Sequence, residues 1–169
     1  MNGRPRFIAP KGGMRQGGYM EQKRINELKE LFLFQLLTVE ELDDAIEFFH
    51  EKMYAGGMKI FSEKEKGETM YVIKNGTVKI SIQEAGREKE IITFSSGEFF
   101  GEITLFEYAL RTATATAVEE VSVLEISRNE FNKLFNQKPQ IAAKILYQMM
   151  SEMSHRLRRK NMPGGGLIF

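Results

Sequence analysis

The sequence predicts a mainly β protein: an antiparallel β-roll (a double-stranded, jelly-roll-like β-helix) with helices before it and one long helix after it. Three observations support this fold class. Short runs rich in β-branched and aromatic residues follow one another between about Met53 and Ser127, glycines separate these runs, and apolar residues at helical spacing flank them on both sides. Many short strands at such spacing are typical of a sandwich or roll rather than of βαβ units.

The segment before the roll has helical periodicity. The apolar residues that recur three and four positions apart are Ile25, Leu28, Leu31 and Phe32. Thr38-Val-Glu-Glu41 has the form of a capping box and predicts a second helix from about Val39 to His50. We assign His50 a structural role, because nothing else in the sequence marks it as a ligand.

The roll itself is predicted to contain six strands. They are Lys59–Phe61, Met70–Lys74, Thr77–Gln83, Lys89–Phe94, Thr112–Ala117 and Val121–Ile126. Asn75-Gly76 stands between two β-rich runs, and a type I′ turn requires positive φ at both of its central residues. The sequence therefore predicts a tight hairpin at Asn75-Gly76.

Helical patterning returns after the roll. Ser127-Arg-Asn-Glu130 forms a second capping box, and Pro139 suits the first turn of a long helix that runs to about Lys160. Its apolar stripe, spaced four, three and four, consists of Leu146, Met150, Met153 and Leu157. This seam predicts a parallel homodimer through the helix, with packing of the stripe against the chain's own roll as the alternative.

These patterns divide the chain into four segments. We predict a flexible basic tail over 1–20, a β-roll with flanking helices over 21–136, a lid or dimerisation helix over 137–160, and a flexible tail over 161–169. The first tail has four basic residues and no acidic one, so it either touches an acidic partner or is a solvated tail without a role.

Composition excludes several classes of function. The 24 Lys and Arg nearly balance 23 Asp and Glu, so net charge does not draw the whole chain to nucleic acid or membrane. There is no Cys and only two His, which excludes thiol catalysis and a multi-histidine metal centre. No apolar run reaches the roughly 20 residues of a membrane span. We expect a soluble, cytoplasmic protein that is not an enzyme and has no catalytic residue, metal or cofactor.

One segment interrupts the strand rhythm. Gly101, followed by Glu102, Ile103 and Thr104, can form a helical turn whose free N–H groups attract an anion. Arg111, at the entry to the next strand, can close over the same anion, and Thr112 adds a hydroxyl and an N–H. A carboxylate repels a phosphate, so Glu102 is expected to accept hydrogen bonds from sugar hydroxyls instead. An anion grip beside a hydroxyl acceptor indicates a nucleotide site.

These residues resemble a known motif. Phe-Gly-Glu-Ile-Thr-Leu-Phe over 100–106, followed by Arg111-Thr-Ala, is similar to the phosphate-binding cassette of cyclic nucleotide-binding domains. Further matches in order and spacing, among them Gly56-Gly57, Gly67 and Gly97-Glu-Phe-Phe100, extend the resemblance over about residues 40–160. Two positions depart from the pattern: Leu110 stands in place of the usual Pro, and Lys64 in place of a frequent Gly.

The resemblance implies a role for each residue of the site. Arg111 would pair with the cyclic phosphate, N–H groups near Thr104 and of Ala113 would complete the cradle, and Glu102 would bind the ribose 2′-hydroxyl. The residues implied to line the pocket behind the base or ribose are Ile80, Ile91 and Phe94. The ligand would be cAMP or cGMP. Thr112 resembles cGMP-binding members, whereas family frequency favours cAMP.

The resemblance also implies a regulatory function. After Lys160 there is no room for the recognition helix of the catabolite activator family, so we expect no direct DNA binding. The expected function is a cyclic nucleotide-binding module that signals through its C-terminal helix to a partner protein of unknown identity. The alternative is a nucleotide-free scaffold subunit with the same fold, in which Glu102 and Arg111 neutralise each other as an ion pair.

Overall fold

The computed structural model describes residues 16–160, and side chains from Lys23 to Arg159. Two helices and a short 3₁₀ turn come first: α1 (Gln16–Glu30), η1 (Phe32–Phe34) and α2 (Val39–Ile46). The strands are β1 (His50–Tyr54), β2 (Lys59–Phe61), β3 (Thr69–Asn75), β4 (Thr77–Glu84), β5 (Arg87–Ser95), β6 (Phe99–Phe100), β7 (Thr114–Ala117) and β8 (Val121–Ser127). The remaining helices are α3 (Ile103–Phe106), α4 (Arg128–Gln137) and α5 (Pro139–Lys160).

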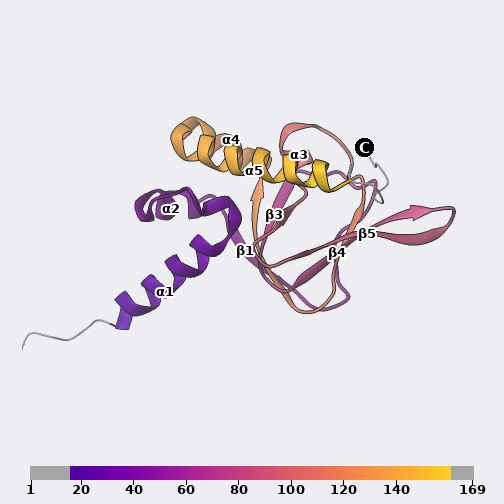
Figure 1. The fold of residues 1–169 in the computed structure, drawn as a ribbon, viewed down its shortest axis with the longest axis horizontal. Coiled ribbons are helices and arrows are strands. Elements are labelled where there is room, and N and C mark those ends of the chain that lie inside the picture. The colour runs from indigo at the N-terminus through magenta and orange to yellow at the C-terminus, as the bar shows by residue number, and fades with distance from the viewer. Residues whose placement is uncertain (1–15, 161–169) are drawn as a thin grey trace, which may run out of the picture.

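The strands form two antiparallel sheets of four, which confirms the predicted fold class. Their orders are β1-β8-β3-β6 and β2-β7-β4-β5. Figure 1 shows the roll with α4 and α5 on one side, α1 and α2 at one end, and the far ends of β4 and β5 projecting at the other.

Alternate residues of β3 serve two separate cores, because successive side chains of a strand point to opposite faces. Met70 and Val72 belong to a cluster with the helices, whereas Tyr71 and Ile73 point into the roll. The helical cluster joins residues of α1, η1, α2, α4 and α5 to one face of the first sheet. The roll therefore has its own interior core and a helical layer packed on its outside.

The predicted hairpin at Asn75-Gly76 is wrong. Gly76 has φ of +92°, but Asn75 is not among the residues with positive φ, and β3 and β4 lie in different sheets. Gly is needed at position 76 because a Cβ would lie 2.6 Å from the carbonyl oxygen of Glu120. The tight hairpin instead joins β4 to β5 through Ala85 and Gly86, both with positive φ.

Other boundaries also differ from the prediction. Residues 16–20, assigned to the tail, begin α1, while the predicted tails at 1–15 and 161–169 lie outside the described residues. The second helix ends at Ile46, and His50 opens β1, which was missed because four of its five residues are exposed and show no apolar alternation. The exposed His50 side chain contacts Glu130 of α4.

Both predicted capping boxes are confirmed. The Thr38 hydroxyl accepts a hydrogen bond from the amide of Glu41 (3.2 Å), and the Glu41 carboxylate accepts one from the amide of Thr38 (2.8 Å). The Ser127 and Glu130 side chains make the same reciprocal contacts at the start of α4. Glu41 also accepts hydrogen bonds from Nζ of Lys144, so α2 is fastened to α5.

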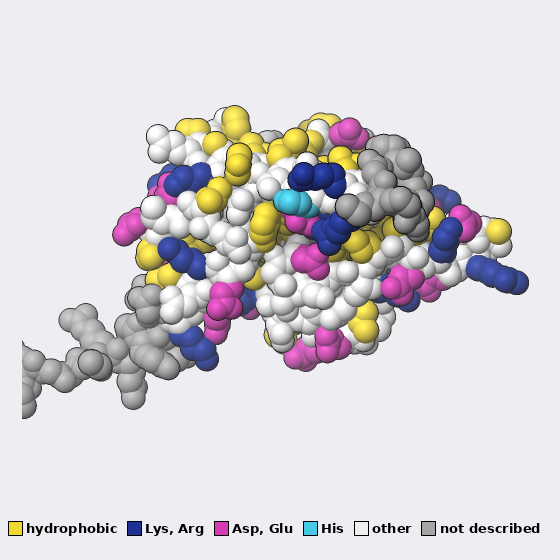
Figure 2. Space-filling model, viewed as in Figure 1, with side chains coloured by type: hydrophobic (Ala, Val, Ile, Leu, Met, Phe, Trp, Pro, Cys, Tyr) yellow, Lys and Arg dark blue, Asp and Glu magenta, His cyan; other side chains and the backbone are white. Residues whose placement is uncertain are grey.

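The predicted seam of α5 is partly wrong. Leu146 and Met153 are half-buried, and Leu146 packs on the helical core. The large apolar side chains that face solvent are Tyr147, Met150 and Leu157. Ala143 and Ser154 are also exposed and complete a 4-3-4-3 spacing with them. Figure 2 shows hydrophobic side chains gathered along the edge of the molecule formed by α4 and α5.

Within residues 16–160, no helix is long and apolar enough to cross a membrane.

Candidate functional site

The predicted cassette is the connection from β6 to β7, with the single helical turn α3 at its centre. Gly101 opens it with φ of +75°, a region that disfavours side chains. A Cβ at position 101 would also lie 2.9 Å from a terminal nitrogen of Arg111 and 3.2 Å from the carbonyl oxygen of Thr69. Both the conformation and the close approach of Arg111 therefore require glycine here.

Arg111 is the centre of the site and is only 6% exposed. One terminal nitrogen, Nη1, donates to the hydroxyl of Thr104 (2.9 Å) and the carbonyl of Gly101 (3.3 Å). The other, Nη2, donates to the carbonyl of Thr69 (2.8 Å). The guanidinium carbon lies 4.0 Å from the ring centre of Phe61, which allows cation–π attraction. The sequence indicated Arg111, Gly101 and Thr104 as site residues, but not Thr69 or Phe61.

The positive charge of Arg111 has no direct counterion among the described side chains. Among the described side chains, no ion pair involves Arg111, so the Glu102–Arg111 pair of the scaffold alternative is not formed. Its Nε is buried and makes no hydrogen bond. Burial lowers the pKa of Arg111, because desolvation disfavours the charged form. A buried cation with an unused donor is well suited to bind an anion.

Gly67 leaves the space in which Arg111 lies. A Cβ at this position would be 2.6 Å from Nε of Arg111 and 2.6 Å from Cγ2 of Thr104. The sequence showed Gly67 only as one of several glycines that match the family pattern. In the structure, the absence of a side chain at Gly67 makes room for the Arg111 guanidinium.

Four aromatic rings run from the cassette across the roll. Tyr71 stacks on Phe100 with ring centres 5.1 Å apart, and Phe100 stacks on Phe94 at 6.3 Å. Phe61 packs against Tyr71 and Phe100. Burial raises the pKa of Tyr71 to about 12, so its hydroxyl stays neutral at physiological pH. Of the predicted pocket residues, Phe94 lies in this stack.

The other predicted pocket residues are placed by a β-bulge. Ile80 of β4 pairs with Ile92, and Ser81 pairs with Glu90, so Ile91 is the extra residue of β5. Ile80 and Ile92 both pack against the interior core. The structure therefore pairs Ile92 with Ile80 and leaves Ile91 at the bulge, and the pocket role implied for Ile91 stays a prediction. Sequence alternation alone could not locate the register shift.

The remaining cassette residues are less enclosed. Glu102 is half-buried at the start of α3, and its carbonyl accepts a hydrogen bond from the amide of Leu105 (3.0 Å). Ile103 and Thr112 are exposed, and Ala113 is half-buried. The structure thus brings Gly101, Thr104 and Arg111 into contact. The roles assigned to Glu102, Ile103, Thr112 and Ala113 stay predictions.

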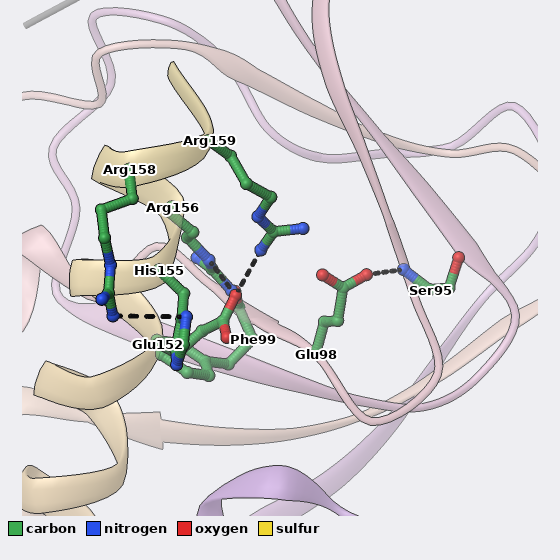
Figure 3. Close-up of polar contacts among 8 residues, drawn as sticks. All are labelled: Ser95, Glu98, Phe99, Glu152, His155, Arg156, Arg158 and Arg159. Atoms are coloured by element: carbon green, nitrogen blue, oxygen red, sulfur yellow. Dashed lines mark hydrogen bonds and ion pairs between the residues drawn. The ribbon is translucent and has the colours of Figure 1, made fainter. Parts of the chain in front are cut away.

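The last turns of α5 cover the end of the aromatic stack. Arg156 donates to the carbonyl of Phe99 (2.8 Å), and its guanidinium carbon lies 4.5 Å from the ring centres of Phe94 and Phe99. Glu152 accepts from Arg156 (3.1 Å) and Arg159 (2.8 Å), as Figure 3 shows. The sequence patterns did not identify these contacts of Arg156.

Two cavities among the described residues lie beside α1, and neither is lined by Arg111 or Glu102. One, of about 340 Å³, lies between the end of α1, the turn from β5 to β6, and α5, with Glu152 and Arg159 on its wall. The other, of about 510 Å³, adjoins it and is lined by residues of α1, β3 and the same turn. The described residues also include no cluster of three or more His, Cys, Asp or Glu that could hold a metal ion.

Comparison with known proteins places the site in context. The family model described as "Cyclic nucleotide-binding domain" matches residues 51–138. The cAMP-activated global transcriptional regulator Vfr of Pseudomonas aeruginosa is 35% identical over 136 residues, covering 78% of this chain and 62% of the relative. The cGMP-dependent protein kinase egl-4 of Caenorhabditis briggsae is 34% identical over 113 residues, covering 65% of this chain and 15% of the relative.

A similar solved structure is the regulatory domain of Toxoplasma gondii PKA, co-crystallised with cAMP. It is 30% identical, has a TM-score of 0.57, and the match covers 70% of this chain and 44% of that one. The chain spans about three fifths of the length of Vfr, so it corresponds to part of that regulator.

Proposed function

Because the chain belongs to the cyclic nucleotide-binding domain family, we propose that it binds cAMP or cGMP at the cassette centred on Arg111. The observation that carries this proposal is the buried Arg111 guanidinium, which has an unused Nε and no ion pair among the described side chains. A cyclic phosphate carries one negative charge and several acceptor oxygens. It would therefore supply both the counterion and the hydrogen-bond acceptor that the Arg111 guanidinium lacks among the described side chains.

The cassette residues take complementary roles in this proposal. Arg111 binds the phosphate, amides near Thr104 and of Ala113 complete the cradle, and Glu102 accepts the ribose 2′-hydroxyl. The absence of a Glu102–Arg111 ion pair among the described contacts leaves the carboxylate available for that role. Ile80, Ile91 and Phe94 are proposed to line the wall for the base or ribose. Ile92, which pairs with Ile80 and packs on the interior core, is added to them.

A thermal unfolding experiment tests nucleotide binding. We expect cAMP or cGMP to raise the midpoint of unfolding, and 5′-AMP, which has no cyclic phosphate, to leave it nearly unchanged. Ligand at 100 times its Kd stabilises the folded state by about 2.7 kcal/mol, a shift that is easily measured. A sample that unfolds cooperatively at the same temperature with either cyclic nucleotide would favour the scaffold function. The observation that supports the scaffold function is that Arg111 already donates hydrogen bonds to three protein oxygens.

The proposed output is movement of α5, acting as a lid or dimerisation helix, toward a partner protein. Arg156 contacts Phe94 and Phe99, so the end of α5 lies against the stack that begins beside Arg111. The solvent-facing stripe of Tyr147, Met150 and Leu157 fits a second copy of the helix in a homodimer. This stripe replaces the seam predicted from the sequence.

Light scattering checks the homodimer. We expect a dimer in the presence of nucleotide and a shift toward monomer in Met150→Glu, which places a charge in the stripe. A protein that stays monomeric at high concentration with and without nucleotide would contradict the dimer. The proposal includes an effector protein, a regulatory rather than catalytic role, and a cytoplasmic location.

A further inference from the structure

We propose that Arg128, the first residue of α4, is a positioning residue for the cassette. It holds the backbone of Thr104 while Arg111 holds the hydroxyl of the same residue, so Thr104 links the anion site to α4. This inference rests on the proposed function, because it concerns how Arg111 is presented to the nucleotide.

Arg128 is bonded to the cassette at several points and is only 8% exposed. Its Nε donates to the carbonyl of Thr104 (3.0 Å), and a terminal nitrogen contacts the carbonyls of Thr104 and Glu107. These two carbonyls lie at the C-terminal end of α3, where carbonyl groups lack helical partners and attract a cation. The guanidinium carbon also lies 3.8 Å from the ring centre of Tyr108.

Thr104 is held from both sides. It is 3% exposed, its hydroxyl accepts from Arg111 and donates to the carbonyl of Gly101 (2.9 Å each), and its carbonyl accepts from Arg128. Among the described side chains, neither arginine takes part in an ion pair. One threonine therefore joins two buried guanidinium groups, and displacement of either changes the contacts of the other.

This link connects the nucleotide to the helical layer. When Arg111 turns toward a phosphate, its bond to the Thr104 hydroxyl changes, and Thr104 is attached through its carbonyl to α4. The side chains of Phe131 and Leu134 on α4 share a core with Ile141 and Ile145 on α5. Thr104 thus contacts both the phosphate site, through Arg111, and the two helices that would carry the signal, through Arg128.

A double-mutant cycle tests the link, with the affinity for cAMP and cGMP measured by calorimetry. Arg128→Gln removes the charge and the paired contacts, and Thr104→Val removes the hydroxyl that Arg111 uses. We expect Arg128→Gln to weaken binding by roughly 3- to 30-fold, the range for a residue that acts through another. In the Thr104→Val background its effect should be several-fold smaller, because the connection to Arg111 is already cut. Arg87→Gln, an exposed arginine at the β4–β5 turn, is the matched control and should bind like the wild type.

Each outcome decides the inference. Additive effects of the two substitutions, or an Arg128→Gln protein with lower thermal stability and unchanged affinity, would give Arg128 a structural role only. If Arg128→Gln does not fold, Arg128→Lys serves in the cycle, since it keeps the charge but loses the planar, paired geometry. If the wild type binds a nucleotide but the effects of Arg128→Gln and Thr104→Val on affinity are additive, this inference is overturned and the proposed function stands. A folded wild type that binds neither nucleotide overturns the proposed function and this inference with it.

Discussion

At the scale of single residues, the site depends on how closely Arg111 is enclosed. Its guanidinium lies between the carbonyls of Gly101 and Thr69, the hydroxyl of Thr104 and the ring of Phe61. Gly101 in the cassette and Gly67 outside it keep this space open. Steric room for one side chain, rather than chain flexibility alone, explains why these positions lack a Cβ.

The first prediction concerns Gly67→Ala. The added methyl would lie 2.6 Å from Arg111 and Thr104, so both side chains must move. We expect overpacking to cost about 1–3 kcal/mol in the free energy of unfolding and to weaken nucleotide binding markedly. Denaturant unfolding and calorimetric titration of the same samples measure the two effects.

Gly86→Ala is the control for this prediction. Gly86 has φ of +77° with nothing near its Cβ position, so the substitution introduces backbone strain far from the site. It should lower stability without changing affinity. Equal affinities for Gly67→Ala and the wild type would contradict the role given to Gly67.

At the scale of elements, local signals located six of the eight described strands and the two capped helix starts. They missed β1 and β6 and did not show which strands pair. The cap at Thr38 and the strand at Lys59–Phe61 were read directly from the sequence and are confirmed. By contrast, the Asn-Gly signal fell at a change between sheets, and the bulge at Ile91 arises from the pairing of β5 with β4. Such features depend on partners distant in sequence, which single-sequence periodicity does not identify.

The second prediction concerns the contact between α2 and α5. The hydrogen bond from Lys144, and then that from the Thr38 amide, lower the pKa of Glu41 below its ordinary value of 4.5. A carboxyl group with a lowered pKa in the folded state stabilises the protein above the unfolded-state pKa. That contribution is lost as pH falls through the folded-state pKa.

We therefore expect Glu41→Gln to lower the free energy of unfolding by about 1 kcal/mol at pH 7, and by less as the pH falls below about 4.5. Urea unfolding between pH 3 and 7 measures this difference. Asp43→Asn, at an exposed position on the same helix, is the control. A Glu41→Gln effect that is the same at every pH would show that the ion pair contributes nothing.

At the scale of the whole molecule, a chain of contacts runs from the cassette through the roll to α5. Arg111 lies against Phe61, the rings of Tyr71, Phe100 and Phe94 continue the stack, and Arg156 closes it. The fold class and the cassette could be predicted from the sequence. The aromatic stack and the contacts of Arg156 could not, because they depend on how the two sheets and α5 come together.

The third prediction concerns the attachment of α5. Arg156→Ala removes the hydrogen bond to the Phe99 carbonyl and the contacts with two rings. We expect faster amide hydrogen exchange in the last two turns of α5, with the roll unchanged, because a charged hydrogen bond of this kind contributes about 1.5–3 kcal/mol. Arg158→Ala, an exposed neighbour, should exchange like the wild type. Equal amide exchange rates in Arg156→Ala and Arg158→Ala would show that Arg156 does not hold the end of α5 against the roll.

The most direct test of the central claim is calorimetric titration of the wild type and Arg111→Ala with cAMP and, separately, cGMP. We expect saturable binding of at least one nucleotide by the wild type and none by the variant, with a thermal melt showing that both are folded. Saturable binding that survives Arg111→Ala, or no binding by a folded wild type, would contradict the assignment of this buried arginine as the anchor of a cyclic nucleotide.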